Sequence, residues 1–393
     1  MRSGGPVRSF REIEKGGIDL DLPVVTLFSG GLDSTYLLYR LQQAGATQVH
    51  ALSVALGGDE TPELSLLADK LGVRLHVVDA RDLFADGYVA PAIAAHAVYL
   101  DTHPVSSSLS RPLIAKIAIE TAERVGALTV LHTANRSQNS LRRLNGALEL
   151  LGFAGHFGSP YDLEPVDRAD KMRELRSLGL DVVAERAVSG DSNLWCREFE
   201  SGFLDDPESH RVPESLYRWS VPDAAPADEH IEIDFRDGVP VAVDGTQLPL
   251  AALIDLLNRR VGRHGLGRSS GLEHLADGTK VLEVREMPAA WLLLRSHRAL
   301  EGATLNAELI REKLHVEQLW VREAVEGRWF GELRNACQAF IDSTSPAVTG
   351  TVRWQLTAAG ANTTSIVAAS PRYLRDREQW ERSSIQAELS HLM

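Results

Sequence analysis

Apolar and amphipathic segments alternate through the first third of the chain. Four runs rich in Val and Leu predict buried strands, at residues 24–28, 49–55, 73–78 and 128–132. Three segments of helical spacing lie among them, at residues 34–43, 62–71 and 111–125. This alternation is typical of a parallel sheet with helices on both faces. We therefore expect a ligand at the carboxyl ends of the strands.

The pattern changes after about residue 165. Segments 231–235 and 239–243 flank Arg236-Asp-Gly238, which predicts a hairpin. Two further helices are expected at 248–265 and 304–325, and a second strand pair is expected at 349–358 and 363–369. The second half is thus predicted to be α+β. We divide the chain into four parts. Residues 1–22 form a flexible or loosely docked leader. Residues 23–165 and 166–370 form two domains, and residues 371–393 form a helix-prone tail that is a candidate oligomerisation segment.

Composition narrows the class of protein. The chain has 393 residues, a net charge of −13 and only two cysteines, Cys196 and Cys337. The cysteine count excludes a disulfide framework and is consistent with a reducing cytoplasm. The acidic balance argues against a nucleic-acid partner. The N-terminus lacks the apolar core of a signal peptide, and no run of 18 apolar residues occurs, so we expect a cytoplasmic protein without a membrane partner.

The sequence Ser29-Gly-Gly-Leu-Asp-Ser34 follows the first predicted strand. Consecutive glycines permit a tight turn that aims several N–H groups into one hollow. The start of the next helix adds the positive end of its dipole, which favours a phosphate. Ser29 and Ser34 can donate hydrogen bonds, and Asp33 can bind Mg²⁺ or fix the loop. A plain turn is the alternative, but the six residues in this setting favour phosphate binding.

The loop resembles the SGGLDS loop of N-type ATP pyrophosphatases. Five later stretches resemble argininosuccinate synthases in the same order, at 108–116, 191–207, 235–245, 261–268 and 340–353. The resemblance runs from about Val24 to about Leu374. It implies an α/β ATP-binding domain with a parallel sheet, an α+β synthetase domain and a helical tail. It also implies ATP and Mg²⁺ as cofactors, small amino-acid-like substrates and a homo-oligomer, either a tetramer or a dimer.

The resemblance assigns site residues position by position. It implies that ATP is bound by Phe28, Ser29, Gly30, Gly31, Leu32, Asp33, Ser34, Thr35, Val54 and His132. Ser29 and Asp33 are expected to be catalytic, and Asp33 is the candidate Mg²⁺ ligand. It places the substrates at His103, Ser107, Ser108, Asn135, Asn139, Ser140, Arg143, Ser189, Glu198, Glu273 and Arg285.

Several substrate positions depart from the family's pattern. The family residues Tyr, Thr, Asp, Ser and Tyr are replaced here by His103, Asn135, Ser140, Glu198 and Arg285. Loss of the family's Asp at position 140 removes a charged acceptor, which is worth about 1.5–3 kcal/mol per hydrogen bond. Glu198 and Arg285 either contact a substrate or form only a structural ion pair. Arg136 either covers phosphate or lies in water.

Three functions are compatible with this pattern. We favour an AMP-forming carbon–nitrogen ligase that adenylates a ureido, amide or carboxylate oxygen of an altered acceptor, because the ATP loop is intact while the amino-acid pockets differ. The first alternative is a genuine argininosuccinate synthase, which joins citrulline and aspartate in arginine biosynthesis. The second alternative is a non-catalytic nucleotide-binding scaffold.

Overall fold

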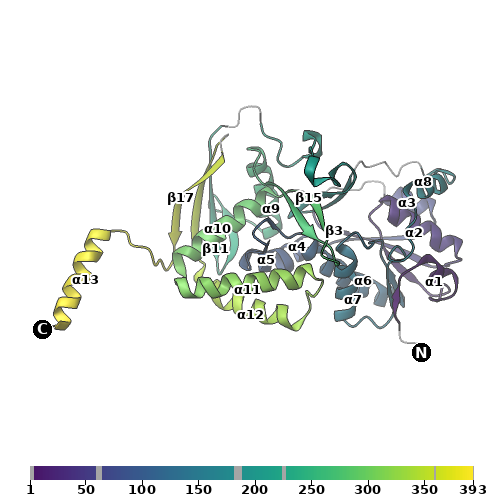
Figure 1. The fold of residues 1–393 in the computed structure, drawn as a ribbon, viewed down its shortest axis with the longest axis horizontal. Coiled ribbons are helices and arrows are strands. Elements are labelled where there is room, and N and C mark those ends of the chain that lie inside the picture. The colour runs from purple at the N-terminus through teal and green to yellow at the C-terminus, as the bar shows by residue number, and fades with distance from the viewer. Residues whose placement is uncertain (1–3, 59–63, 181–187, 224–226, 358–359, 393) are drawn as a thin grey trace.

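The computed structural model describes residues 4–58, 64–180, 188–223, 227–357 and 360–392. The parallel sheet lies at one end of the molecule, and the sheet that contains β11 (Glu229–Arg236) and β17 (Gly360–Ala368) lies towards the other (Figure 1). The C-terminal helix α13 (Arg377–Leu392) extends away from the body. None of the helices in the described ranges is long and apolar enough to cross a membrane.

A six-stranded sheet organises the first domain, and all of its strand pairs are parallel. In spatial order its strands are β1 (Pro6–Val7), β8 (His156–Gly158), β7 (Thr129–Leu131), β2 (Val24–Leu27), β3 (Val49–Ala55) and β4 (Arg74–Asp79). Val24 and Val25 point to opposite faces, as neighbours in a strand must, and both are fully buried. The expected parallel sheet with two covered faces is therefore confirmed.

The helices of this domain pack on both faces of the sheet. They are α2 (Leu32–Gln43), α3 (Leu64–Lys70), α4 (Arg81–Phe84), α5 (Ala90–Ala94), α6 (Ser107–Val125), α7 (Ser140–Leu150) and α8 (Arg168–Arg176). Helices α6 and α7 share a core with Val25, whereas α2 shares one with Val24. The domain also contains a π-helical turn η1 (Ala85–Val89) and a short ribbon of β5 (Val98–Tyr99) and β6 (His103–Pro104).

One predicted helix starts earlier than expected, and the start of another lies outside the described residues. Helix α6 begins at Ser107 rather than at 111 and includes Pro112 in its second turn, where proline removes the N–H that would otherwise bond the Ser108 carbonyl. It ends at Gly126 in the left-handed conformation, as predicted. Pro62, the expected start of the following helix, lies outside the described residues.

The N-terminal leader is folded onto this domain rather than loosely docked. Strand β1 extends the sheet beside β8, and helix α1 (Phe10–Glu14) follows it with a capping box between Ser9 and Glu12. The buried Phe10 ring packs edge-on against Tyr161. The sequence pattern missed this because β1 is only two residues long and α1 only five.

The second half contains two antiparallel sheets. The first sheet consists, in order, of β14 (Arg268–His274), β15 (Lys280–Glu286), β10 (Cys196–Glu200) and β9 (Ser189–Asn193). The second consists of β13 (Thr246–Gln247), β12 (Val239–Val243), β11 (Glu229–Arg236), β16 (Gly350–Thr357) and β17 (Gly360–Ala368). The predicted hairpin of β11 and β12 and the strand pair of β16 and β17 are confirmed. The first sheet was not predicted.

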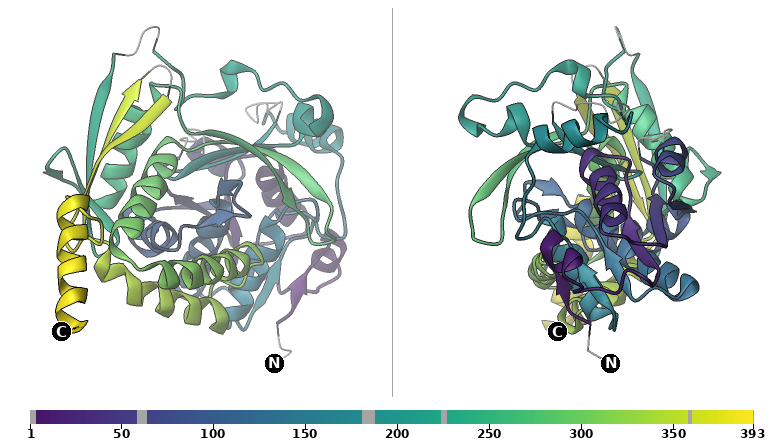
Figure 2. Two further views of the ribbon diagram at one scale, coloured as in Figure 1. Left: turned by 60° about the vertical axis from the view of Figure 1, so that its left-hand side comes forward. Right: turned by 90° about the vertical axis from the view of Figure 1, so that its right-hand side faces the viewer.

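Long helices pack beside these sheets (Figure 2). They are α9 (Leu250–Gly262), α10 (Pro288–Thr304), α11 (Ala307–Val325) and α12 (Glu332–Thr344). Short 3₁₀ turns complete the domain: η2 (Gly202–Leu204), η3 (Pro207–Ser209), η4 (Glu214–Leu216) and η5 (Ser345–Ala347). The predicted start of a helix at Thr304 was wrong, because Thr304 ends α10. The side chain of Asn306 caps α11 by accepting the Leu309 N–H at 2.7 Å.

Candidate active site

The loop between β2 and α2 is closed by its own serines. Gly30 has φ +69°, a conformation that glycine adopts without strain. Ser29 Oγ accepts the Gly31 N–H at 3.4 Å and lies 3.3 Å from Ser34 Oγ. Ser34 Oγ in turn donates to the Gly31 carbonyl at 3.1 Å. Leu32 starts α2, so the loop points the helix N-terminus along the sheet's carboxyl edge.

The neighbours of the loop follow from the order of the strands. The Phe28 side chain is buried in a core shared with α2, so only its backbone can face a ligand. Val54 is half-buried near the end of β3, the strand beside β2. His132 follows β7 on the other side and is buried, with Nε2 2.9 Å from Asn145 Oδ1. Burial lowers the pKa of His132 to about 4, so its ring is neutral at pH 7.

Asp33 is paired with a residue that the sequence did not single out. Lys171, on α8, places Nζ 2.5 Å from Asp33 Oδ1. The Tyr161 hydroxyl donates to the Asp33 carbonyl at 3.0 Å. The described residues contain no group of three or more His, Cys, Asp or Glu that could cage a metal. Mg²⁺ in such sites is usually held by one or two carboxylates together with substrate phosphates, so Asp33 fits as its single protein ligand.

The second domain closes over the carboxyl edge of the parallel sheet. Leu194, between β9 and β10, donates its N–H to the Leu56 carbonyl at 2.8 Å, just after β3. A Cβ on Gly58 would collide with the backbone of Ser192, so the two chains are in close contact. Arg111 on α6 spans the same junction, 3.0 Å from Asp191 on β9. The site therefore lies between the two domains.

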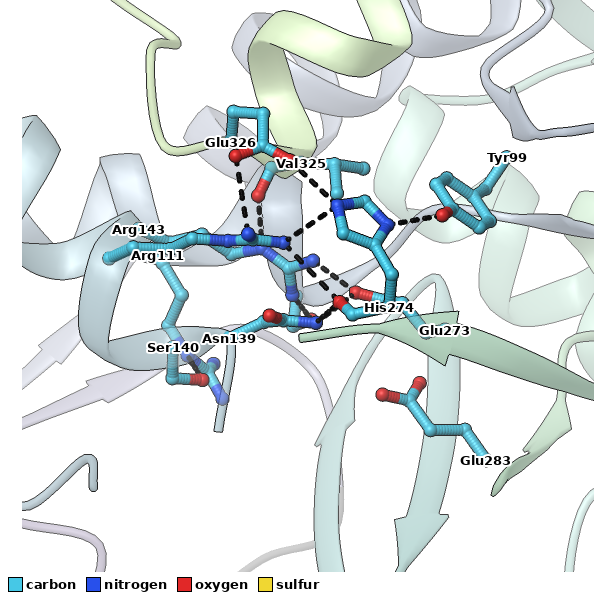
Figure 3. Close-up of polar contacts among 12 residues, drawn as sticks. Tyr99, Arg111, Asn139, Ser140, Arg143, Glu273, His274, Glu283, Val325 and Glu326 are labelled. Carbon is cyan, nitrogen blue, oxygen red and sulfur yellow. Dashed lines mark hydrogen bonds and ion pairs between the residues drawn. The ribbon is translucent and has the colours of Figure 1, made fainter. Parts of the chain in front are cut away.

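A buried cluster of charged side chains fills this junction (Figure 3). Glu273, on β14, accepts hydrogen bonds from Asn139 at 2.8 Å and from Arg143. Arg143 also donates to Ser107 Oγ at 2.7 Å and to the Val325 carbonyl at 3.1 Å. These hydrogen bonds bring Ser107, Asn139, Arg143 and Glu273 together, as the resemblance implied. Burial would raise the pKa of Glu273, but Arg143, His103 and Arg285 hold it well below its usual value.

Arg285 enters the same cluster from β15 and is only 1% exposed. Arg285 lies directly opposite Glu198 of β10, with Nε 3.5 Å from Glu198 Oε1. Its Nη2 lies 3.0 Å from Glu273 Oε2 and also contacts Glu283, two residues earlier on the same face. The structure thus joins Glu198 and Arg285 in an ion pair. Within the described part of the chain, the buried Arg285 Nη1 has no hydrogen-bond partner.

The carboxylates of this cluster do not all carry a charge at neutral pH. Burial raises the pKa of Glu283 to about 8, and the neighbouring Glu273 and Glu198 add to the effect. Arg285 lowers the pKa of Glu283, but Arg285 also interacts with the carboxylates of Glu198 and Glu273. Glu283 is therefore mostly protonated at pH 7 although it contacts Arg285. Burial also raises the pKa of Glu200, which lies opposite Glu283 on β10.

His103 lies at the edge of this cluster. Its ring is fully buried, with Nδ1 2.9 Å from Thr102 Oγ1 and Nε2 3.7 Å from Glu273 Oε2. Burial lowers the pKa of His103, and Glu273 opposes that shift only in part. The ring is therefore neutral at pH 7 and can act as a hydrogen-bonding side chain beside Glu273.

The remaining predicted substrate residues are spread around the cluster. Ser108 is buried on α6. Ser140 accepts a hydrogen bond from Arg111 Nε at 3.1 Å. Asn135 uses its side chain to close its own turn, since Oδ1 accepts from Ser137 N and Oγ. Ser189 is exposed at the start of β9, where it pairs with Glu200.

Sequence reasoning missed Arg111, Asp191 and Lys171. Arg111 stands inside the stretch SLSRPLIAK that carried part of the resemblance, and this was the available signal for it. Burial opposes the charge of Arg111, but Asp191 outweighs it and raises the pKa. No local pattern marks Lys171, because its partner Asp33 is 138 residues away.

Comparison with known proteins agrees with this arrangement. Residues 23–151 match the family described as "Arginosuccinate synthase N-terminal HUP domain", and residues 188–381 match "Arginosuccinate synthase C-terminal domain". The argininosuccinate synthase of Rubrobacter xylanophilus is 36% identical over 92% of this chain and 89% of that protein. That of Methanopyrus kandleri is 36% identical over 90% of this chain and 91% of its own.

A solved structure, the NH3-dependent NAD synthetase from Campylobacter jejuni, matches with a TM-score of 0.31 and 17% identity, over 44% of this chain and 70% of that one. The two family matches and the long relatives are decisive. Their domains coincide with the parallel sheet that carries the Ser29–Ser34 loop and with the sheets that carry the charged cluster. This chain is therefore an ATP-dependent carbon–nitrogen ligase that belongs to the argininosuccinate synthase family.

Proposed function

We propose that this chain joins citrulline and aspartate with the energy of ATP, as an argininosuccinate synthase. The observation that carries the proposal is the placement of the phosphate loop and the Asn139–Arg143–Glu273 set at one domain junction. The relatives named argininosuccinate synthase support this activity over the altered acceptor that the sequence favoured. The relatives named above do not support a scaffold without catalysis.

The proposed reaction begins at the Ser29–Ser34 loop. Its N–H groups and the start of α2 hold the phosphates of ATP, so that the ureido oxygen of citrulline can attack the α-phosphorus. The bond to the β-phosphate breaks, and pyrophosphate leaves with the electron pair. The aspartate amine then attacks the ureido carbon of the citrullyl-adenylate, and AMP leaves. Holding both substrates in line supplies much of the rate.

The chain's own residues divide the binding work. Arg143 and Asn139 suit the carboxylate of the acceptor, because a guanidinium and an amide both donate hydrogen bonds. Glu273 suits its amino group. Asp33 would hold Mg²⁺, which supplies charge neutralisation of the phosphates when it is bound. Lys171 keeps the Asp33 carboxylate in place.

A second candidate activity uses a different acceptor, and Arg285 favours it. Arg285 occupies the junction with its guanidinium already bonded to Glu273, the residue expected to receive the acceptor's amino group. An acceptor with an additional anionic or carbonyl group would find a donor in the buried, unpartnered Nη1 of Arg285. The reaction type is unchanged, and only the joined molecules differ.

Pyrophosphate release separates these activities. Purified protein with ATP and Mg²⁺ is incubated with citrulline and aspartate, and the product is identified by mass spectrometry. Pyrophosphate release at an ordinary enzymatic rate with argininosuccinate as product supports the first proposal. ATP binding without release by this pair, but with release by another acceptor, replaces it with the second. Protein that binds no ATP refutes both.

We also propose a cytoplasmic homo-oligomer, a tetramer or a dimer. Helix α13 extends from the body (Figure 1). Its Trp380, Ile385 and Leu389 side chains are exposed. Burying these side chains against another copy of the chain would stabilise an assembly by removing apolar surface from water. Cys196 and Cys337 are both free, which suits a reducing compartment.

A further inference from the structure

Four neighbouring parallel strands end in a row beside the phosphate loop. Their spatial order is β1, β8, β7 and β2, so the residues that follow each strand emerge at the same edge of the sheet. Arg8 follows β1, Asp162 lies after β8, Arg136 lies after β7, and Ser29 follows β2. Neighbouring strands are about 4.8 Å apart. The folded leader therefore brings an arginine to the edge that carries the ATP loop.

Asp162 holds both arginines. Arg8 Nε lies 2.5 Å from Asp162 Oδ2, and Arg136 Nε lies 2.8 Å from Asp162 Oδ1 and 3.1 Å from its carbonyl oxygen. Asp162 is only 8% exposed, whereas the side chains of Arg8 and Arg136 are 42% and 62% exposed. One carboxylate thus holds two guanidinium groups, and the carboxylate of Glu12 also acts electrostatically on Arg8.

Both arginines are engaged through Nε alone in the part of the chain that the structure describes. The two Nη nitrogens of each guanidinium are thus available to an anion, and they present the paired N–H groups that bind a phosphate. Glu12, whose charge acts on Arg8, has its Oε2 bonded to the backbone N–H groups of Arg8 and Ser9.

The cluster is also tied directly to the phosphate loop. Tyr161, the residue before Asp162, donates its hydroxyl to the Asp33 carbonyl at 3.0 Å. Arg136 belongs to the loop after β7, the strand that pairs with β2. A polyphosphate seated on the Ser29–Ser34 loop therefore has Arg136, and beyond it Arg8, on one flank.

We propose that Arg8 and Arg136, held in place by Asp162, bind the pyrophosphate portion of ATP, so that the N-terminal leader completes the ATP site. This inference rests on the chain's use of ATP but not on the identity of the acceptor. A surface ion pair of purely structural value needs one arginine for one carboxylate, and such pairs contribute little. Two arginines on one buried carboxylate, both with free Nη groups, instead form a receptor for an anion.

Direct binding measurements test the proposal without any acceptor. ATP, pyrophosphate and AMP are titrated calorimetrically into wild type, Arg8→Gln and Arg136→Gln. We expect ATP and pyrophosphate to bind about five- to tenfold more weakly to each variant at low salt. We expect AMP binding to stay unchanged, because AMP lacks the β- and γ-phosphates. The difference should shrink at about 1 M salt, where exposed charges are screened.

Arg11→Gln is the matched control. It removes the same charge three residues further on, from the short helix α1 that follows Arg8, at an exposed position whose side chain makes no ion pair among the described residues. Arg8→Lys should recover part of the lost affinity, since it restores the charge without the paired donors. Equal ATP and pyrophosphate affinity in wild type, Arg8→Gln and Arg136→Gln would overturn this inference alone. Equal weakening of AMP and ATP would assign Arg8 a structural role and would also overturn it. Wild type that binds neither ATP nor pyrophosphate would overturn the proposed function as well.

Discussion

Replacing Glu273 by Gln tests the electrostatic account of the buried cluster. Glu273 is the carboxylate shared by Arg143 and Arg285, and both guanidinium groups are almost fully buried. The change keeps the shape of the side chain and removes its charge. Arg143 would then retain only neutral acceptors, Ser107 Oγ and the Val325 carbonyl.

The expected loss of stability follows from the buried guanidinium charges that remain without Glu273. Breaking a buried ion pair from one side leaves an uncompensated charge and typically costs about 3–5 kcal/mol. Glu283→Gln is the matched control on the neighbouring strand. Because the pKa of Glu283 is raised to about 8, it is mostly protonated at pH 7, and glutamine resembles that neutral form. We expect this control to cost less than about 1 kcal/mol.

The pH dependence of stability has opposite signs for the two residues. The pKa of Glu273 is lowered by folding, so its contribution is complete above its unfolded value of about 4.3 and is lost as the pH falls through its folded value. The pKa of Glu283 is raised, so its burial destabilises the fold increasingly between about pH 4.3 and 8. Glu283→Gln should therefore gain stability relative to wild type as the pH rises from 6 to 8.

Scanning calorimetry and urea unfolding at pH 6, 7 and 8 measure both variants. At roughly 2–4 °C per kcal/mol for a domain of this size, Glu273→Gln should lower Tm by about 10 °C at pH 7. Glu283→Gln should change it by less than about 3 °C. The reasoning fails if the two variants lose equal stability, or if the rank order is reversed.

Four further outcomes are expected. Asp33→Ala should leave Tm within about 2 °C of wild type and abolish pyrophosphate release, and retained activity would contradict the site assignment. Lys171→Met should raise KM for ATP by several-fold in a steady-state assay, because the Asp33 carboxylate loses its support. His103→Gln should keep the shape of the pH–rate profile between pH 6 and 8, since burial lowers the pKa of His103 and its ring is already neutral there; a lost ionisation in that range would instead make His103 a catalyst. Deletion of 376–393 should reduce the oligomer measured by light scattering, and an unchanged mass would refute the role of α13.

The geometry of the Ser29–Ser34 loop was predictable because its signal is local. Gly30 and Ser34 stand within six residues of each other, between a strand and a helix that were both visible in the pattern. The parallel order of the strands then fixes which loops meet at one edge. The resemblance added Asn139, Arg143 and Glu273, and the structure brings these three together.

The acceptor half could not be derived in the same way. Its cluster depends on the register of β10, β14 and β15, which places Glu198 directly opposite Arg285. Those strands carry charged residues on a buried face, so the usual alternation of apolar and polar positions is absent there. The leader was missed for another reason, because β1 is stable only as an addition to an existing sheet.

The bonds of Glu273 indicate how the two candidate activities differ energetically. Glu273 already accepts hydrogen bonds from Asn139, Arg143 and Arg285, so an amino group of an acceptor at Glu273 would compete with a guanidinium. Arg143 is anchored by Ser107 and Val325, whereas the other contacts of Arg285 are a mostly protonated Glu283 and a Glu198 oxygen at 3.5 Å. Arg285 is therefore the less firmly anchored of the two guanidinium groups. Under the proposed function, citrulline would displace Arg285 at a cost in binding energy, whereas an acceptor with its own anionic group would keep Arg285 bound. The KM for citrulline in wild type, compared with Arg285→Tyr, measures that cost: a large decrease in the variant favours a different natural acceptor, and no change favours citrulline.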